Sequence, residues 1–233
     1  MDWNTVYSRK RVLFIVIFGV AALIAQQINF SQVLGAENQF FTMFQFLGPI
    51  AGGFLGPIAG AASVLLAEIG GFLLLGKDVT FVNLMRLTPM LFAAYYFATR
   101  TAKISRIVPL VAMAAFLLHP VGAEAWYYSL YWLIPVIASF LPENLFMRSL
   151  GATFTAHSVG GVVWIYTFPT TAAFWTALIP IVAFERLMFA GGITSSFIVV
   201  NTVLHRFVSV IPVNALWIDA RYVLTRQGLG LKA

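Results

Sequence analysis

The sequence predicts an all-α fold, a polytopic helical membrane protein whose 233 residues form one integral membrane domain. Hydrophobic residues make up 61% of the chain and charged residues only 9%, with a mean hydropathy of +0.90. A soluble domain usually has about 25% charged residues, so this chain cannot cover a surface that faces water. The apolar runs, such as VLFIVIFGVAALIA, are continuous rather than alternating, which predicts membrane helices and not a membrane barrel.

The net charge of +6 and the absence of cysteine limit the kinds of site that the chain can hold. Basic residues that flank spans on the cytoplasmic side account for the charge, and no compact basic domain is present, so we predict no nucleic-acid partner. Without cysteine there is no disulfide, thiolate metal site or cysteine nucleophile. We expect a multi-pass protein of the cell membrane in contact with lipid.

About six spans are expected, at about 20 residues each. The first covers residues 12–28 and is expected to be retained, because Gln26 and Gln27 make a poor cleavage signal. A polar and aromatic connection follows at residues 29–45. Further spans are expected near residues 81–98, 108–118, 126–140, 150–168 and 174–210.

The last of these stretches is too long for one straight crossing at about 1.5 Å per residue. It is a long tilted helix, a hairpin, or a span followed by an interfacial helix. Gly191 and Gly192 mark where it could break.

A direct repeat, FLGPIAG, stands at residues 46–52 and 54–60. Its glycines recur every four residues, a spacing that gives a helix a smooth ridge where another helix can approach closely. Prolines at 49 and 57 disfavour helix at the preceding glycines. The segment is a close-packed helix pair with a proline kink, or a broken segment that shapes a ligand cavity, and the two can coexist.

The path of this segment decides the topology. Basic residues near both chain ends (9–11, Arg221, Arg226 and Lys232) indicate the cytoplasmic side, and so does the cluster Arg100, Lys103 and Arg106. If the repeat crosses the membrane once, that cluster lies outside, whereas a hairpin places it inside. We favour cytoplasmic termini and an even number of spans.

The long loop after the first span, LGPIAG and the small-residue run behind it resemble the S component of energy-coupling factor importers, over roughly residues 1–75. In that family two alanines separated by three residues dock the first span on a coupling protein. Ala21 and Ala25 match that spacing, and the expected docking residues are Ala21, Ala25, Gly48, Gly52, Gly56 and Gly60.

The resemblance implies a substrate-binding subunit for a vitamin-like or metal solute. The solute would bind from the outer side, under the loop 29–45, and transport would need a separate membrane coupling subunit with ATPases. No GxxxxGK[ST] motif occurs. We predict no enzyme activity and no cofactor.

Ionisable residues at membrane depth are costly and often functional. Glu68 is a candidate ligand or proton carrier, or it forms a salt bridge with Arg86. Asn83 and Arg86 share a helix face and could hold a ligand carboxylate; alternatively, Arg86 pairs with Glu68 or extends toward the interface. We predict Glu68, Asn83, Arg86, Trp126 and His157 as substrate-binding residues.

Trp126 opens an aromatic cluster that is either an interfacial belt or a wall for a planar ligand. His157 is either a helix-packing residue or a ligand. Its possible metal partners, His119, Glu124 and Glu185, lack any ligand spacing, so no metal site is predicted. Glu185 and Arg186 are adjacent, and we expect each to find a partner elsewhere.

Two other functions compete with solute binding. An intramembrane enzyme would use the same acidic and histidine side chains, but no HExxH, GxSxG or paired acidic motif is present. A structural subunit of a larger complex would use the glycine ridge only for docking.

Overall fold

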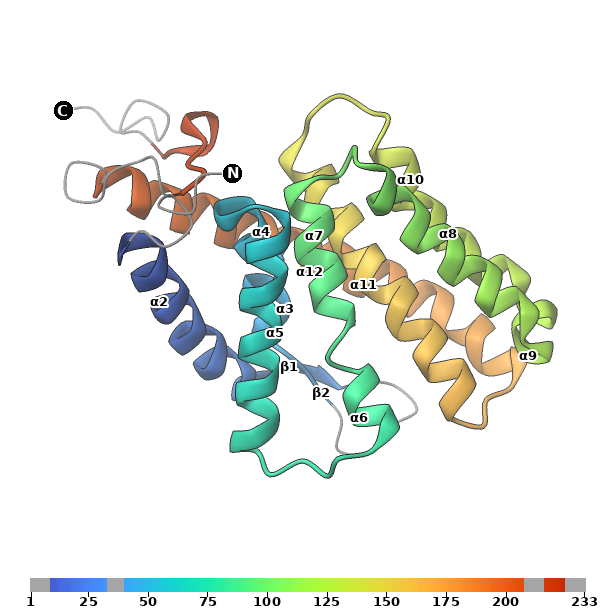
Figure 1. Cartoon of the computed structure of the whole chain (residues 1–233). Helices are drawn as coiled ribbons and strands as arrows, with labels where there is room; N and C mark the ends of the chain where they lie inside the picture. Colours follow the sequence, from blue (N-terminus) through green and yellow to red (C-terminus); the bar gives the residue numbers. More distant parts are fainter. Residues whose placement is uncertain (1–8, 33–39, 208–215, 225–233) are drawn as a thin grey trace.

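The computed structural model describes residues 9–32, 40–207 and 216–224. The expectations for residues 33–39 and 208–210, and for Arg226 and Lys232, lie outside these ranges. The described chain is mostly helical, in agreement with the all-α prediction (Figure 1). In chain order the elements are α2 (Arg9–Gln26), β1 (Asn29–Gln32), β2 (Phe40–Thr42), α3 (Phe44–Leu47), α4 (Ile50–Leu55), α5 (Pro57–Leu74), α6 (Phe81–Met85), α7 (Pro89–Ala98), α8 (Lys103–Leu118), α9 (Pro120–Glu124), η1 (Trp126–Trp132), α10 (Leu133–Ala138), α11 (Leu145–Thr167), α12 (Ala172–Arg206) and η3 (Ala220–Tyr222).

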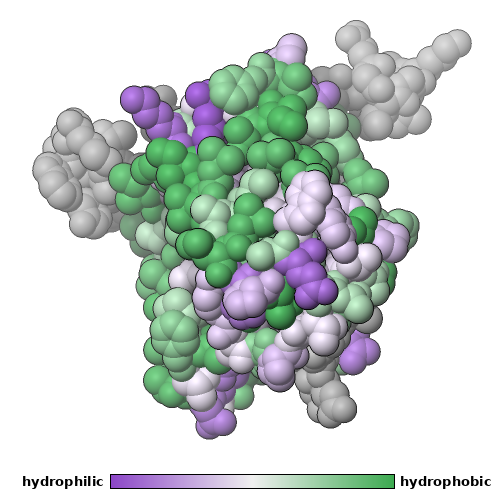
Figure 2. Space-filling view, turned by 90° about the vertical axis from the view of Figure 1, so that its right-hand side faces the viewer, coloured by the Kyte–Doolittle hydropathy of each residue, from purple (hydrophilic) through white to green (hydrophobic). Residues whose placement is uncertain are grey.

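Two of the described helices, α5 and α12, are long and apolar enough to cross a membrane. Shorter apolar helices cover Val12–Gln26 and Phe44–Leu55. Large apolar side chains are also exposed elsewhere, including Ile107, Val111 and Leu118 on α8. Figure 2 views the side on which α8 and α9 lie, and hydrophobic residues cover much of it.

The Gly- and Pro-rich segment forms a hairpin rather than one crossing. At its turn, Gly56 has φ 83° and ψ 175°, a conformation that is essentially restricted to glycine. Pro57 then begins α5, where its missing N–H removes no helix bond. Figure 1 shows α5 returning from this turn beside α4.

The glycine ridge packs inside the chain. All four glycines, Gly48, Gly52, Gly56 and Gly60, are buried, so they are not free to dock a partner as expected. A Cβ on Gly52 would run into the carbonyl of Ala94 on α7, and one on Gly60 would meet the backbone of Gly52. The ridge therefore lets α4, α5 and α7 approach one another closely, which agrees with the close-packed helix pair.

The alanine pair of α2 does not form an exposed face either. Ala25 is 4% exposed and packs in the core, whereas Ala21 is only partly buried. The exposed side of α2 is built from large side chains, among them Val16, Val20 and Ile24. The docking role expected for Ala25 is thus corrected, because the helix turns this residue toward its own chain.

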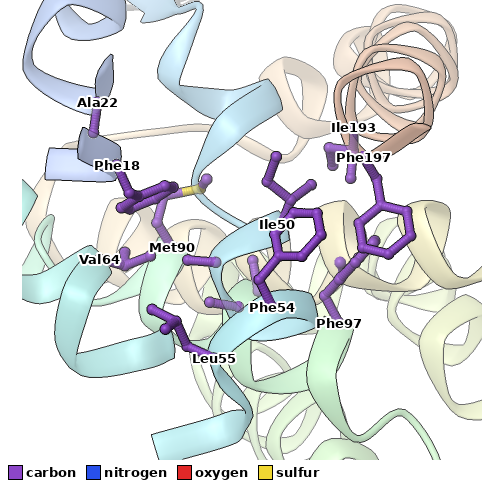
Figure 3. Close-up of a cluster of buried hydrophobic side chains, with 14 of the residues drawn as sticks. Phe18, Ala22, Ile50, Phe54, Leu55, Val64, Met90, Phe97, Ile193 and Phe197 are labelled. Atoms are coloured by element: carbon purple, nitrogen blue, oxygen red, sulfur yellow. The ribbon is translucent and has the colours of Figure 1, made fainter. Parts of the chain in front are cut away.

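The core lies between α2, the hairpin, α7 and α12 (Figure 3). Phe54 of α4 stacks on Phe197 of α12 with ring centroids 4.9 Å apart, and Phe97 of α7 packs against Phe197 at 5.3 Å. Phe14 of α2 meets the edge of Phe54 at 5.7 Å. Aromatic contacts therefore join elements that are far apart in the sequence.

Several expected spans differ in detail. Residues 81–98 form two helices, because the chain turns at residues 86–88 before Pro89 begins α7. Residues 126–140 form the 3-10 helix η1 followed by the short α10. In contrast, α12 runs unbroken for 35 residues through Gly191 and Gly192, so the long-helix alternative holds.

Basic residues gather at the end of the molecule where α7 ends and α8 begins (Figure 1). Arg100 donates to the Glu143 carboxylate at 2.8 Å and to the carbonyl of Leu141 at 2.9 Å. Arg148 donates to the carbonyl of Phe97 and lies 3.9 Å from Glu143. The start of α2 and the turn at Gly56 lie at this same end (Figure 1), as the hairpin topology requires.

The segment 216–224 lies against this basic end. Trp217 donates its backbone N–H to the carbonyl of Phe54 at 2.9 Å, and its ring covers Gly56. The Asn201 amide of α12 donates to the carbonyls of Asp219 and Tyr222 at 2.7 and 3.0 Å. The segment is therefore joined to both the hairpin turn and α12.

The opposite end of the molecule carries the antiparallel pair β1–β2, in which Ser31 faces Phe41 and Gln32 faces Phe40. The loop after α5 and helix α6 lie at the same end (Figure 1). Thr80 caps α6 by accepting the N–H of Asn83 at 3.2 Å. Residues of these elements line part of the cavity described below.

Candidate functional site

A cavity of about 630 Å³ lies between the β1–β2 pair and the helices. Its walls come from β2, α3, α5, α6, α11 and α12, together with Tyr128 of η1. Small-molecule sites commonly occupy about 300–1,000 Å³, so this volume suits a small organic molecule.

Four of the five predicted substrate-binding residues line this cavity. Glu68 comes from α5, Asn83 and Arg86 from α6 and its end, and His157 from α11. Trp126 does not line the cavity, and its side chain is 54% exposed. The structure therefore brings together residues spread over about 90 positions and leaves Trp126 outside.

Glu68 and Arg86 do not form the salt bridge that was one of the two alternatives for Glu68. No ion pair within the described ranges joins them, although the charges of Arg86 and Lys77 both act on the Glu68 carboxylate. Asn83 uses its amide to donate to the carbonyl of Asp78 at 2.9 Å, which fixes the loop before α6. Glu68 and Arg86 thus present their charged groups to the cavity rather than to each other.

His157 stands in a hydrogen-bonded chain. The indole N–H of Trp132 donates to its Nδ1 at 3.0 Å, and its Nε2 lies 3.0 Å from the hydroxyl of Tyr128. Tyr128 is 1% exposed and lines the cavity, whereas Trp132 lies behind it in the core. His157 is therefore a hydrogen-bonded packing residue that also faces the cavity, so its two proposed roles coexist.

Arg186 of α12 contributes a buried cation to the cavity wall. Its Nη2 lies 3.4 Å from the carboxylate of Glu185, so these neighbours do pair with each other, contrary to our expectation. The Nη1 of Arg186 also donates to the Thr153 hydroxyl of α11 at 3.3 Å, which is the partner on another helix that we expected. Adjacent helix positions diverge at the backbone, but both side chains are long enough to curl together. The guanidinium also lies 4.4 Å from the ring centroid of Phe189 and 5.0 Å from that of Phe41.

Aromatic side chains form much of the remaining wall. Trp175 of α12 packs its ring 4.8 Å from that of Tyr128, and its indole donates to Thr170 at 3.0 Å. Trp164 and Phe168 of α11 lie 4.3 Å apart at their centroids. The only signal for these three residues in the sequence is their aromatic character, which membrane helices share widely.

The geometry bears on a metal solute as well. No group of three His, Asp or Glu side chains close enough to hold an ion occurs among the described residues. His119, weighed earlier as a partner of His157, instead caps α9 by accepting the N–H of Val121 at 3.3 Å. Glu124 is exposed and outside the cavity.

No protein-family model, curated protein or solved structure gives a significant match to this chain. The function is therefore argued from the cavity and its surroundings.

Proposed function

We propose that this chain is a polytopic protein of the cell membrane and the solute-binding subunit of an importer. The observation that carries this is the cavity, which combines aromatic walls with the charged groups of Glu68 and Arg86 that have no ion-pair partner among the described residues. Both side chains are only partly buried. Ionisable groups within apolar segments are costly and are often retained because they bind a ligand.

The distribution of charge supports uptake from outside. The cavity lies toward the β1–β2 end, opposite the end that carries Arg100, Lys103 and Arg106 (Figure 1). Basic residues mark the cytoplasmic side of a membrane protein. The cavity then faces the outer side beneath the connection between the first and second spans, as the resemblance to S components implies.

A separate coupling subunit with ATPases belongs to this proposal, since the sequence holds no nucleotide-binding motif. The glycine ridge and Ala25 are buried, so the partner would contact other surfaces. The exposed apolar sides of α2, α5 and α8 are in contact with lipid or with that partner.

The direct test is native mass spectrometry of the detergent-purified protein, with any co-purified small molecule identified after denaturation. We expect a stoichiometric organic solute. Glu68→Gln and Arg86→Gln should reduce its occupancy, whereas Glu124→Gln, outside the cavity, should not. A protein that carries no solute, and whose melting temperature no member of a broad metabolite panel raises, would disprove solute binding.

A further inference from the structure

The hydrogen-bonded chain behind the cavity fixes the positions of its protons. An indole N–H is only a donor, so the Nδ1 of His157 must accept from Trp132 and carries no hydrogen. A neutral imidazole then holds its hydrogen on Nε2, which lies 3.0 Å from the Tyr128 oxygen. His157 therefore donates to Tyr128, because a doubly protonated ring would set two N–H groups against each other at Trp132.

This arrangement leaves the Tyr128 hydroxyl hydrogen without an acceptor. The hydroxyl oxygen accepts from His157, and no other residue within the described ranges bonds to it. Buried hydroxyl groups are almost always paired. Since the side chain is 1% exposed and lines the cavity, the missing acceptor belongs to whatever occupies the cavity.

Arg186, which lines the same cavity as Tyr128, adds further hydrogen-bond donors. Its side chain is 2% exposed, and its Nε has no partner. Its Nη1 donates to the Thr153 hydroxyl at 3.3 Å, and its Nη2 lies 3.4 Å from the Glu185 carboxylate, so Nε is the nitrogen that is left without a partner among the described residues. Arg186, Tyr128 and His157 all line the cavity. This end of the cavity thus has more hydrogen-bond donors than acceptors.

The neighbouring walls favour a flat molecule. Trp175 and Trp164 line the cavity, together with Phe174 and Phe168. Aromatic side chains pack well against planar rings, in stacked or edge-on contact. Polar donors at one end and aromatic rings along the walls are complementary to a planar ring that bears an oxygen.

Resting on the proposed solute-binding function, we propose that the solute is a planar organic molecule that presents a hydrogen-bond acceptor, a carboxylate or carbonyl oxygen, to the Tyr128 hydroxyl and Arg186. Trp132 is a positioning residue: it touches no solute but sets the tautomer of His157, and through it the direction of the Tyr128 hydroxyl.

The test uses ring-matched probes in detergent. One set is indole-3-acetate, indole-3-acetamide and tryptamine, and a second is nicotinate, nicotinamide and 3-(aminomethyl)pyridine. We expect the acids and amides to raise the melting temperature and the amines to leave it unchanged. Two outcomes would overturn the assignment: the amines raise the melting temperature as much as the acids do, or no member of either set raises it.

Variants then locate the contact. Tyr128→Phe should lower the affinity for the acid and amide probes roughly fivefold to tenfold, which is the effect of one lost hydrogen bond. Tyr127→Phe is the control, because that hydroxyl bonds Thr176 at 2.6 Å outside the cavity. Unchanged affinity in Tyr128→Phe contradicts the proposal.

Trp132→Phe provides a readout independent of direct contact. Nitrogen NMR of labelled histidine should show the Nε2–H tautomer of His157 in the unmodified protein and lose that preference in the variant, together with some affinity for the acids. An Nδ1–H tautomer in the unmodified protein would contradict the inference that His157 donates to Tyr128. If native mass spectrometry finds a solute without a planar acceptor group, this inference fails while the proposed function stands.

Discussion

Glu143 shows how a single carboxylate can organise the basic end of the molecule. It lies 2.8 Å from Arg100, which follows α7, and 3.9 Å from Arg148 of α11, and both cations are largely buried. The same guanidinium groups also donate to backbone carbonyls, so they hold the ends of three helices together. The carboxylate therefore balances charges that backbone bonds alone leave uncompensated.

We predict that Glu143→Gln lowers the stability by about 1–3 kcal/mol, the usual range for hydrogen bonds to charged groups. The physical reason is that Arg100 and Arg148 would then lie close together without a counter-charge. The measurement is the melting temperature in detergent. Glu124→Gln is the control, because Glu124 is exposed; equal melting temperatures for both variants would contradict the role of Glu143.

Single-residue reasoning identified part of the cavity before the structure. Glu68, Arg86 and His157 stood out because ionisable groups are rare inside apolar runs, and all three line the cavity. Trp126 and Tyr128 belong to the same aromatic cluster, but only Tyr128 lines the cavity. In WYYSLYW five of the seven residues are aromatic, and only the irregular 3-10 turn of η1 decides which ring points inward.

At the scale of elements, the glycines allow the hairpin to form. The spacing of four residues correctly predicted a close approach between helices. It did not reveal the partner, because a smooth ridge fits a helix of the same chain as well as one of another protein. The partner helix α7 was not predicted as a separate element, because the sequence was interpreted as one span through residues 86–88, where the chain turns.

We predict that Gly52→Ala destabilises the fold by about 1–3 kcal/mol or prevents folding, as overpacking does. The new methyl group would meet the carbonyl of Ala94, which is backbone and cannot move aside cheaply. Gly19→Ala and Gly191→Ala are matched controls, because a Cβ at either position has nothing within 4 Å. Yield and melting temperature check the result: a Gly52→Ala protein as stable as the controls would refute the contact.

At the scale of the whole molecule, composition predicted a mostly helical chain, and large apolar side chains are exposed on α2, α5 and α8. The charged clusters left two topologies open, and the hairpin is the alternative in which the start of α8 lies at the same end as the start of α2 (Figure 1). The sequence could not predict the extent of each helix, because α6 with α7, and η1 with α10, are pieces that only tertiary packing joins.

We predict that the loop after α5 faces outward and the loop after α7 faces the cytoplasm. The chain contains no cysteine, so single substitutions give clean probes. Val79→Cys, at a position 78% exposed, should react with a membrane-impermeant maleimide on intact cells. Ala102→Cys or Lys103→Cys should react only after permeabilisation. The opposite pattern, or labelling of both ends from one side, would reject this orientation.

The unbroken α12 has a mechanical consequence. It carries Arg186 at the cavity and Asn201 at the segment 216–224, with Pro180 as its only proline and no break at Gly191 or Gly192. Over about 15 residues the helix is a rod about 22 Å long, at about 1.5 Å per residue. A rod pivots as a unit, so a rotation of about 5° at one end shifts the other by about 2 Å over that length. If α12 pivots in this way, Arg186 at the cavity and Asn201 at the segment 216–224 move together.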